Sequence, residues 1–250
     1  MNRIAKLAVA GLLLPWVEGA SAADRSPSDW RFSVNLYGWV SNLKGSVNTA
    51  EATHPADIDF SHGDVLQHLK FAAFGSFEGR KDRLVVMSDL TYAHLGASSG
   101  IGPGDADLVD AELDASTFTG TVLGGYQVAR GSVDVDLLAG ARVVVNDTDL
   151  VLSGPQRSVE GDVTETWIDP IIATQIAFPV SERATLNFYG DMGGGSSDFT
   201  WQAIAGIRYR LSRRWSLTGA WRYYSVDYDK DFFVYDVTQS GPVLGARFEF

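Results

Sequence analysis

The alternation of apolar and polar residues is the feature that most constrains this chain. It recurs in segments from about residue 30 to residue 250. Successive side chains of a strand point to opposite faces of a sheet, so this pattern predicts strands with one apolar and one polar face. Ten strands are expected, over residues 30–41, 69–80, 84–97, 111–128, 132–147, 164–178, 184–191, 200–211, 214–226 and 240–250. The predicted fold class is therefore all-β.

The connections between these segments are short and long by turns. Short connections cover residues 80–83, 129–131, 180–183 and 211–214, and longer ones cover 42–68, 98–110, 148–163, 192–199 and 227–239. Bacterial outer-membrane barrels have short periplasmic turns and longer extracellular loops. A sheet with open edges in hydrocarbon would leave N–H and C=O groups unpaired, so it must close on itself. We expect a closed antiparallel transmembrane β-barrel of about ten strands.

The apolar faces of the predicted strands are expected to contact lipid. Examples are the sets Leu84, Val86, Leu90 and Tyr92; Val133, Val135, Leu137, Ala139, Ala141 and Val143; Ile168, Ile172, Ile176 and Phe178; and Trp215, Leu217, Gly219, Trp221 and Tyr223. Aromatic residues near the strand ends are expected to form two girdles at the membrane interfaces. The alternative is a soluble barrel or sandwich in which the same face forms a core.

The amino terminus predicts export. Arg3 and Lys6 precede an apolar run from Leu7 to Val17, which Ala20-Ser21-Ala22 follows. This is the pattern of a cleaved signal peptide over residues 1–22, and it leaves residues 23–250 as one barrel domain. The run is shorter than the roughly 20 residues that a membrane-spanning helix requires. We expect the mature protein in the outer membrane.

Charge and cysteine content exclude several other classes. The formal net charge is −11, so nucleic acid is not an expected partner, because phosphate neutralisation requires an excess of Lys and Arg. The chain has no cysteine, which excludes disulfides, thiolate metal sites and cysteine nucleophiles. No cofactor is expected.

The opposite faces of the strands are polar and charged. The residues expected to form a lumenal charge network are Glu78, Asp89, Asp136, Arg142, Asp169, Asp191, Arg208, Arg222 and Arg247. Buried charges are tolerated when they are paired and hydrogen-bonded, so these groups are expected to interdigitate and fill the lumen. A barrel of eight strands is filled by its side chains, and ten strands lie near that limit. The alternative is a narrow or gated channel for small solutes.

No catalytic or metal-binding residue is predicted. The histidines are His54, His62, His68 and His94, and no motif places them beside a nucleophile. The segment Asp227-Tyr-Asp-Lys-Asp231 begins like a calcium loop but has Phe232 and Thr238 where an EF-hand requires glycine and glutamate. A lipid- or peptide-directed enzyme remains the second alternative, with His94 and His62 as the residues to test.

Several motifs resemble a family of small proteobacterial outer-membrane β-barrel proteins, similar in plan to the OmpA and opacity-protein group. They are Asp136-Leu-Leu-Ala-Gly-Ala-Arg142, Trp167-Ile-Asp-Pro170, Gly190-Asp-Met-Gly-Gly194, Trp221-Arg-Tyr-Tyr224 and Gly241-Pro-Val-Leu-Gly245. The family implies a membrane-embedded barrel and assigns no catalytic residue.

The last strand resembles the signal by which Gram-negative bacteria recognise barrels for assembly. Phe248 and Phe250 would be that signal. The expected partners are the barrel assembly machinery, periplasmic chaperones, outer-membrane lipids and lipopolysaccharide. The leading hypothesis is a structural or surface-interaction role. A further hairpin, with residues 43–47 pairing with 58–60, and a short helix over residues 64–68 are also open possibilities.

Overall fold

A computed structural model of the chain describes residues 29–48, 56–101, 109–153, 158–230 and 233–250. The predicted signal peptide, His54 and Asp231 lie outside these ranges. The elements are β1 (Arg31–Trp39), β2 (Asn42–Asn48), β3 (Ala56–Phe60), α1 (His62–His68), β4 (Leu69–Lys81), β5 (Leu84–Ile101), β6 (Val109–Ala129), β7 (Asp134–Ser153), β8 (Ser158–Pro179), β9 (Ala184–Gly193), β10 (Phe199–Arg210), β11 (Trp215–Lys230) and β12 (Phe233–Glu249).

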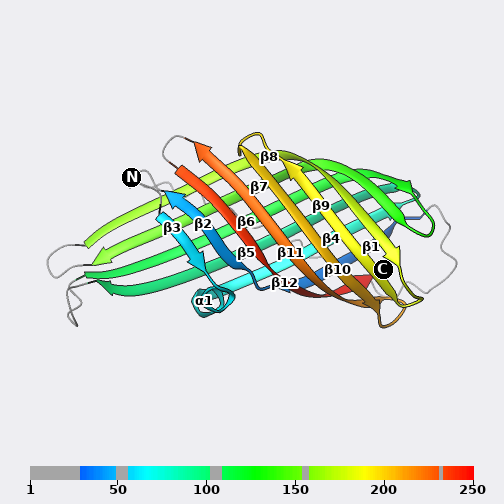
Figure 1. Ribbon diagram of the computed structural model, residues 1–250, viewed down its shortest axis with the longest axis horizontal. Helices are drawn as coiled ribbons and strands as arrows, with labels where there is room; N and C mark the ends of the chain where they lie inside the picture. The colour runs from blue at the N-terminus through cyan, green and yellow to red at the C-terminus, as the bar shows by residue number, and fades with distance from the viewer. Residues whose placement is uncertain (1–28, 49–55, 102–108, 154–157, 231–232) are drawn as a thin grey trace.

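Ten of these strands close into an antiparallel barrel, as predicted (Figure 1). Each strand from β4 to β12 pairs with its neighbour in sequence, and β1 pairs with both β4 and β12. The closing seam extends to the end of the chain. The N–H of Phe32 donates to the carbonyl of Phe250 at 3.1 Å, and the N–H of Phe250 donates to the carbonyl of Phe32 at 2.9 Å. Both edges of β1 are therefore paired, one with β4 and the other with β12, and the sheet has no open edge there.

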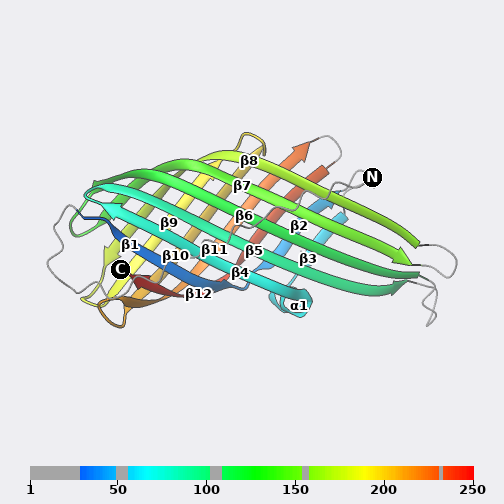
Figure 2. The ribbon, with the colours of Figure 1, turned by 180° about the vertical axis from the view of Figure 1, so that it is seen from behind.

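The first strand changes its neighbour partway along the wall. β2 continues β1 along β12, but its other edge pairs with β3 instead of β4. The predicted hairpin is confirmed, with Leu43 opposite Phe60 and Val47 opposite Ala56. Helix α1 follows β3 and leads into β4 (Figure 2). No helix in the described part of the chain is long and apolar enough to cross a membrane.

The short helix begins two residues earlier than predicted because its first turn is capped. The Ser61 side chain accepts a hydrogen bond from the N–H of Asp64, and the Asp64 carboxylate accepts one from the N–H of Ser61 at 2.9 Å. This capping box satisfies N–H groups that have no partner within the helix.

Two of the predicted long loops are mostly strand. The segment 227–239 was expected to be a loop, but β11 extends to Lys230 and β12 begins at Phe233. Likewise β7 and β8 extend into the expected loop 148–163 and pair from Asp149–Asp162 to Ser153–Ser158. The outward face of these extensions carries polar residues such as Asp162, Asp227 and Asp236, so they lack the apolar outward face that identifies a membrane strand. The backbone ladder continues nevertheless, and Figure 1 shows β5 to β8 extending far beyond the other strands.

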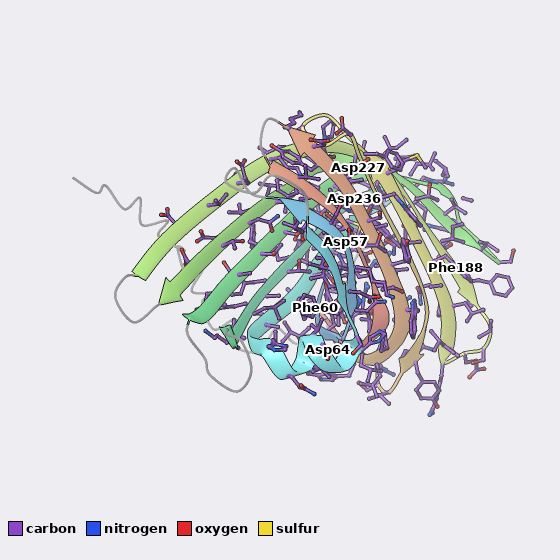
Figure 3. The ribbon with its side chains drawn as sticks, turned by 60° about the vertical axis from the view of Figure 1, so that its left-hand side comes forward. Asp57, Phe60, Asp64, Phe188, Asp227 and Asp236 are labelled. Atoms are coloured by element: carbon purple, nitrogen blue, oxygen red, sulfur yellow. The ribbon has the colours of Figure 1, made fainter. Side chains whose placement is uncertain are left out.

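The predicted lipid faces are exposed on the barrel exterior. Large apolar side chains on these faces include Leu84, Leu137, Ile172, Trp221 and Leu244, which is 73% exposed. Figure 3 shows Phe188 pointing away from the barrel wall.

Aromatic residues pair on this exterior face at both ends of the wall. At the short-turn end Trp215 lies 4.9 Å from Phe248 between ring centroids, and at the other end Trp201 lies 4.7 Å from Tyr223. The exterior thus has the apolar band and flanking aromatic residues that a membrane barrel requires.

Candidate functional site: the barrel lumen

The lumenal charge network is divided into separate groups along the barrel. The group nearest the short turns centres on Glu78, which is 8% exposed. Arg80 donates to it at 2.8 Å and Arg247 donates at 2.8 Å. Arg80 also reaches Asp136 at 2.6 Å, so one guanidinium joins two carboxylates from different strands. The arrangement links β4, β7 and β12 across the lumen.

A second group holds the most deeply buried ion pair. Arg142 donates to Asp191 at 2.6 Å, and both side chains are almost fully buried. The Thr121 and Thr200 hydroxyls accept from the same guanidinium at 3.3 and 3.1 Å. The same Asp191 oxygen accepts from Tyr189 at 2.7 Å. These contacts offset part of the desolvation of both charges, because further hydrogen bonds stabilise a buried ion pair. The other carboxylate oxygen of Asp191 is buried and has no hydrogen-bond partner among the described residues.

A third group joins β11, β5 and β1. Arg222 lies 3.1 Å from Asp89 and donates to the Tyr37 hydroxyl at 2.9 Å. The Tyr37 hydroxyl in turn donates to Asp89 at 2.7 Å, which completes a three-membered ring of contacts. The guanidinium also lies 4.6 Å from the centre of the Trp39 ring, where it is attracted by the negative face of the aromatic system.

Two of the predicted network residues lie outside these ion pairs. Asp169 is completely buried but accepts a hydrogen bond from the backbone N–H of Ser197 at 2.7 Å, and no ion pair within the described ranges includes it. The bend at Ser197 brings an N–H group to Asp169 in place of a guanidinium. Arg208 lines the lumen as expected, yet its guanidinium has no hydrogen bond or ion pair among the described residues. For these two residues the prediction of pairing was wrong.

The apolar filling of the lumen was not predicted from the sequence. The side chains of Val144, Trp167, Tyr224, Val226 and Tyr228 form a buried cluster. The Trp167 and Tyr228 rings stack with centroids 4.5 Å apart. All five occupy the inward parity of their strands, so apolar residues at these positions were a usable signal. A second cluster consists of Val85, Leu123, Leu138, Ile171 and Ala173.

Three cavities follow one another through the lumen. The first, of about 660 Å³, lies at the short-turn end and is lined by residues that include Arg213 and Glu249. The second, of about 180 Å³, shares Glu78, Arg208 and Arg247 with the first. The third, of about 80 Å³, lies beneath α1 and shares Arg222 with the second. Two of the three ion-pair groups, those of Glu78 and Arg222, thus stand between successive cavities.

The histidines do not converge on a lumenal site. His94 follows the outward parity of Leu90, and its Nε2 lies 3.0 Å from the Asp114 carboxylate, which Lys70 also contacts. His62 contacts the carbonyl of Ser240 at 3.1 Å instead. His94 and Asp114 therefore meet on the outside of the wall.

Carboxylates also gather on the outer extensions of the strands. Asp227 lies directly opposite Asp236, and Ser46 separates Asp236 from Asp57 in the next strands (Figure 3). Partial burial and then the neighbouring Asp236, Asp198 and Asp229 raise the pKa of Asp227. Within the described ranges no group of three or more His, Asp or Glu side chains has an arrangement that could hold a metal ion.

The fold is similar to solved outer-membrane barrels. The outer membrane protease OmpT from Escherichia coli matches with a TM-score of 0.57 and 9% identity, over 92% of this chain and 100% of that chain. The translocator domain of the autotransporter NalP from Neisseria meningitidis matches with a TM-score of 0.50 and 12% identity, over 88% of each chain. No protein-family model and no curated protein matches the sequence. At these identities the similarity concerns the fold alone, and the chain has the fold of an outer-membrane β-barrel.

Proposed function

We propose that this protein is an integral outer-membrane barrel with a sealed lumen and a structural or surface-interaction role. The observation that carries the proposal is the filling of the lumen. The Arg142–Asp191 pair and the stacked rings of Trp167 and Tyr228 occupy the space through which a solute would pass. Outer-membrane lipids and lipopolysaccharide would surround the wall, and its assembly would use periplasmic chaperones and the barrel assembly machinery.

The surface role rests on the outer strand extensions. They carry Asp227, Asp236 and Asp57 on neighbouring strands, where each side chain is exposed. A surface that carries charge of one sign attracts partners of opposite charge and repels partners of like charge. In a surface role, the barrel would contact extracellular partners through these extensions.

Planar-bilayer recording tests the sealed lumen. Purified protein is expected to give no discrete channel steps, because the Arg222–Asp89–Tyr37 contacts and the aromatic cluster close the lumen in series. Replacing Trp167 by alanine and Arg222 by alanine together should produce conductance. The matched control is Trp201→Ala with Arg210→Ala, in residues of the exterior and the turn end. Reproducible channel steps from the unmodified protein would contradict the proposal of a sealed barrel.

A second candidate is a gated path for small solutes. The observation that favours it is the series of three cavities, which share Glu78, Arg208, Arg247 and Arg222 at their junctions. In this case breaking one junction would open the path. Glu78→Gln should then raise conductance stepwise while the barrel stays folded, and an unchanged closed state in this variant would argue against gating there.

We propose no catalytic role. The third possibility, a lipid- or peptide-directed enzyme, is tested by turnover of lipid A or a peptide with His94→Ala and His62→Ala. Loss of a measured activity in either variant would overturn the noncatalytic proposal.

A further inference from the structure

The cavity at the short-turn end is rich in arginine. Its volume is about 660 Å³, and the arginines that line it are Arg31, Arg80, Arg130, Arg208, Arg213, Arg214 and Arg247. The acidic side chains that line it are fewer, namely Glu78, Asp134, Asp136 and Glu249. This cavity, here called the arginine chamber, therefore carries excess positive charge in a chain whose net charge is −11.

The ion pairs within the chamber use only some of its arginines. Arg80 and Arg247 form ion pairs with Glu78, Asp136 and Glu249 at 2.6 to 3.3 Å. The remaining acidic group is Asp134, whose carboxylate accepts from the backbone N–H of Gly131 at 3.1 Å.

Other lining arginines have different roles. Arg130 donates to the side chain of Gln127 at 2.6 Å and to the carbonyl of Asp82. No hydrogen bond or ion pair in the described part of the chain involves the guanidinium groups of Arg31, Arg208, Arg213 and Arg214. Four cationic groups with free donors thus line one cavity.

Arg208 has the most informative position among these four. It lines both the arginine chamber and the adjoining cavity of about 180 Å³, so its guanidinium lies at their junction. Two neighbouring cations that act on it, Arg80 and Arg247, are held by carboxylates. Glu78 and Glu249 also attract it, but neither forms an ion pair or hydrogen bond with it among the described contacts. A partly buried charge without a partner is costly, and an anion in the chamber would reduce that cost.

We propose that the arginine chamber binds a small multivalent anion bearing carboxylate or phosphate groups, with Arg208 as its innermost contact. The planar guanidinium presents paired N–H donors that match two oxygens of a carboxylate or phosphate. The volume falls in the range of small-molecule sites, roughly 300–1,000 Å³. Arg31, Arg213 and Arg214 would contact the same anion from the mouth of the chamber. The Arg142–Asp191 pair and the aromatic cluster lie further along the lumen, so binding requires no conduction.

Calorimetric titration of the folded barrel in a nonionic detergent tests this proposal. Citrate and pyrophosphate are the two anionic probes, and sucrose is the uncharged one. We expect at least one anion to bind, sucrose not to bind, and affinity to fall as salt concentration rises because the contacts are charged. Binding of citrate alone would identify a carboxylate ligand, and binding of pyrophosphate alone would identify a phosphate ligand.

Variants then locate the site. Arg208→Gln removes the innermost cation and should lower affinity about tenfold, which corresponds to roughly 1.4 kcal/mol. Arg183→Gln is the matched control, since Arg183 lies in a short turn at the same end but does not line the chamber. Its affinity should equal that of the unmodified protein. Equal losses in the two variants, or no binding of either anion to the folded barrel, would overturn the proposal.

A second measurement needs no variant. Phenylglyoxal modifies accessible guanidinium groups, and mass spectrometry reports the extent at each arginine. A saturating anion should slow modification of Arg208 several-fold while leaving Arg183 unaffected. Unchanged modification of Arg208 in the presence of the anion would exclude it as a contact even if the Arg208→Gln barrel failed to fold.

Discussion

The two ends of the lumen are filled in opposite ways. At the short-turn end, arginines surround a cavity of about 660 Å³ and several of them lack a carboxylate partner. In the other half, Trp167, Tyr224 and Tyr228 pack into a buried cluster. Both regions belong to the same ten strands and are built from inward-facing positions. The comparison shows that a barrel of one size is closed or hollow according to which side chains occupy those positions.

The physical cause of the difference is solvation. Aromatic rings gain free energy by leaving water and stacking on one another, so they close the space between the strands. Guanidinium groups of like charge repel and remain hydrated unless a carboxylate joins them, so they keep a space open. The buried ion pair of Arg142 and Asp191 combines features of both regions, because it is charged but dry, and hydroxyl groups of Thr121 and Thr200 accept hydrogen bonds from its guanidinium.

The largest effect is expected at the seam that closes the short-turn end. Phe250 exchanges two backbone hydrogen bonds with Phe32, and its ring lies 6.0 Å from that of Phe32 on the lipid side. Phe250→Asp places a charge in this apolar surface and should reduce the yield of assembled barrel several-fold. Heat-modifiable migration and membrane yield measure the effect, and Glu249→Gln is the control. Normal yield of Phe250→Asp would contradict its role in assembly.

The second-largest effect is expected at the Arg142–Asp191 ion pair, which lies between the two ends of the lumen. Arg142→Met leaves the Asp191 carboxylate buried without a cation, which is expected to lower the free energy of unfolding by about 3–5 kcal/mol. Urea unfolding followed by tryptophan fluorescence measures it. The double variant Arg142→Met with Asp191→Leu should recover most of the loss, since no unpaired charge remains. A double variant as unstable as the single one would show that packing, and not charge, dominates here.

Disrupting the aromatic cluster should lower the free energy of unfolding somewhat less. Trp167 is 2% exposed and stacks on Tyr228, so Trp167→Ala leaves a cavity and is expected to destabilise the barrel by about 3 kcal/mol. The same urea experiment measures it, with Trp201→Ala on the exterior as the comparison. Because Trp201 is only half-buried, replacing it should lower the free energy of unfolding by a smaller amount. Equal losses for the two tryptophans would remove the distinction between a packed lumen and a lipid-facing surface.

The smallest effect is expected on the acidic outer extensions. The raised pKa of Asp227 means that the folded state binds its proton more tightly than the unfolded state, so this group lowers stability as pH rises above the ordinary value of 3.8. Asp227→Asn removes the repulsion by Asp236 and should add roughly 0.3 kcal/mol at neutral pH.

A pH series of urea unfolding measures this gain. It should vanish below pH 3.8, where the carboxyl is protonated in both states. Asp57→Asn is the control, because Ser46 separates Asp57 from Asp236 and the repulsion is weaker. A gain for Asp227→Asn that stays the same at low pH would show that charge repulsion is not its cause.

Local pattern was sufficient to identify the faces of the strands. Leu84 and Ile172 were predicted to face lipid and are exposed, while Arg142 and Asp191 were predicted to face the lumen and are buried. It was not sufficient to pair the lumenal charges. Asp169 meets the backbone of Ser197, more than twenty residues away, and no periodicity within a strand reports that contact.

The sequence by itself determined the barrel, its closing strand and the inward or outward direction of most side chains. These properties follow from a period of two residues and from the requirement that every backbone group in lipid be paired. Only the tertiary structure decided how the lumen is filled, which arginines have partners and where β2, which continues β1 along β12, pairs with β3 instead of β4. Those features depend on the register between strands and on contacts across the barrel, which join residues that are distant in the chain.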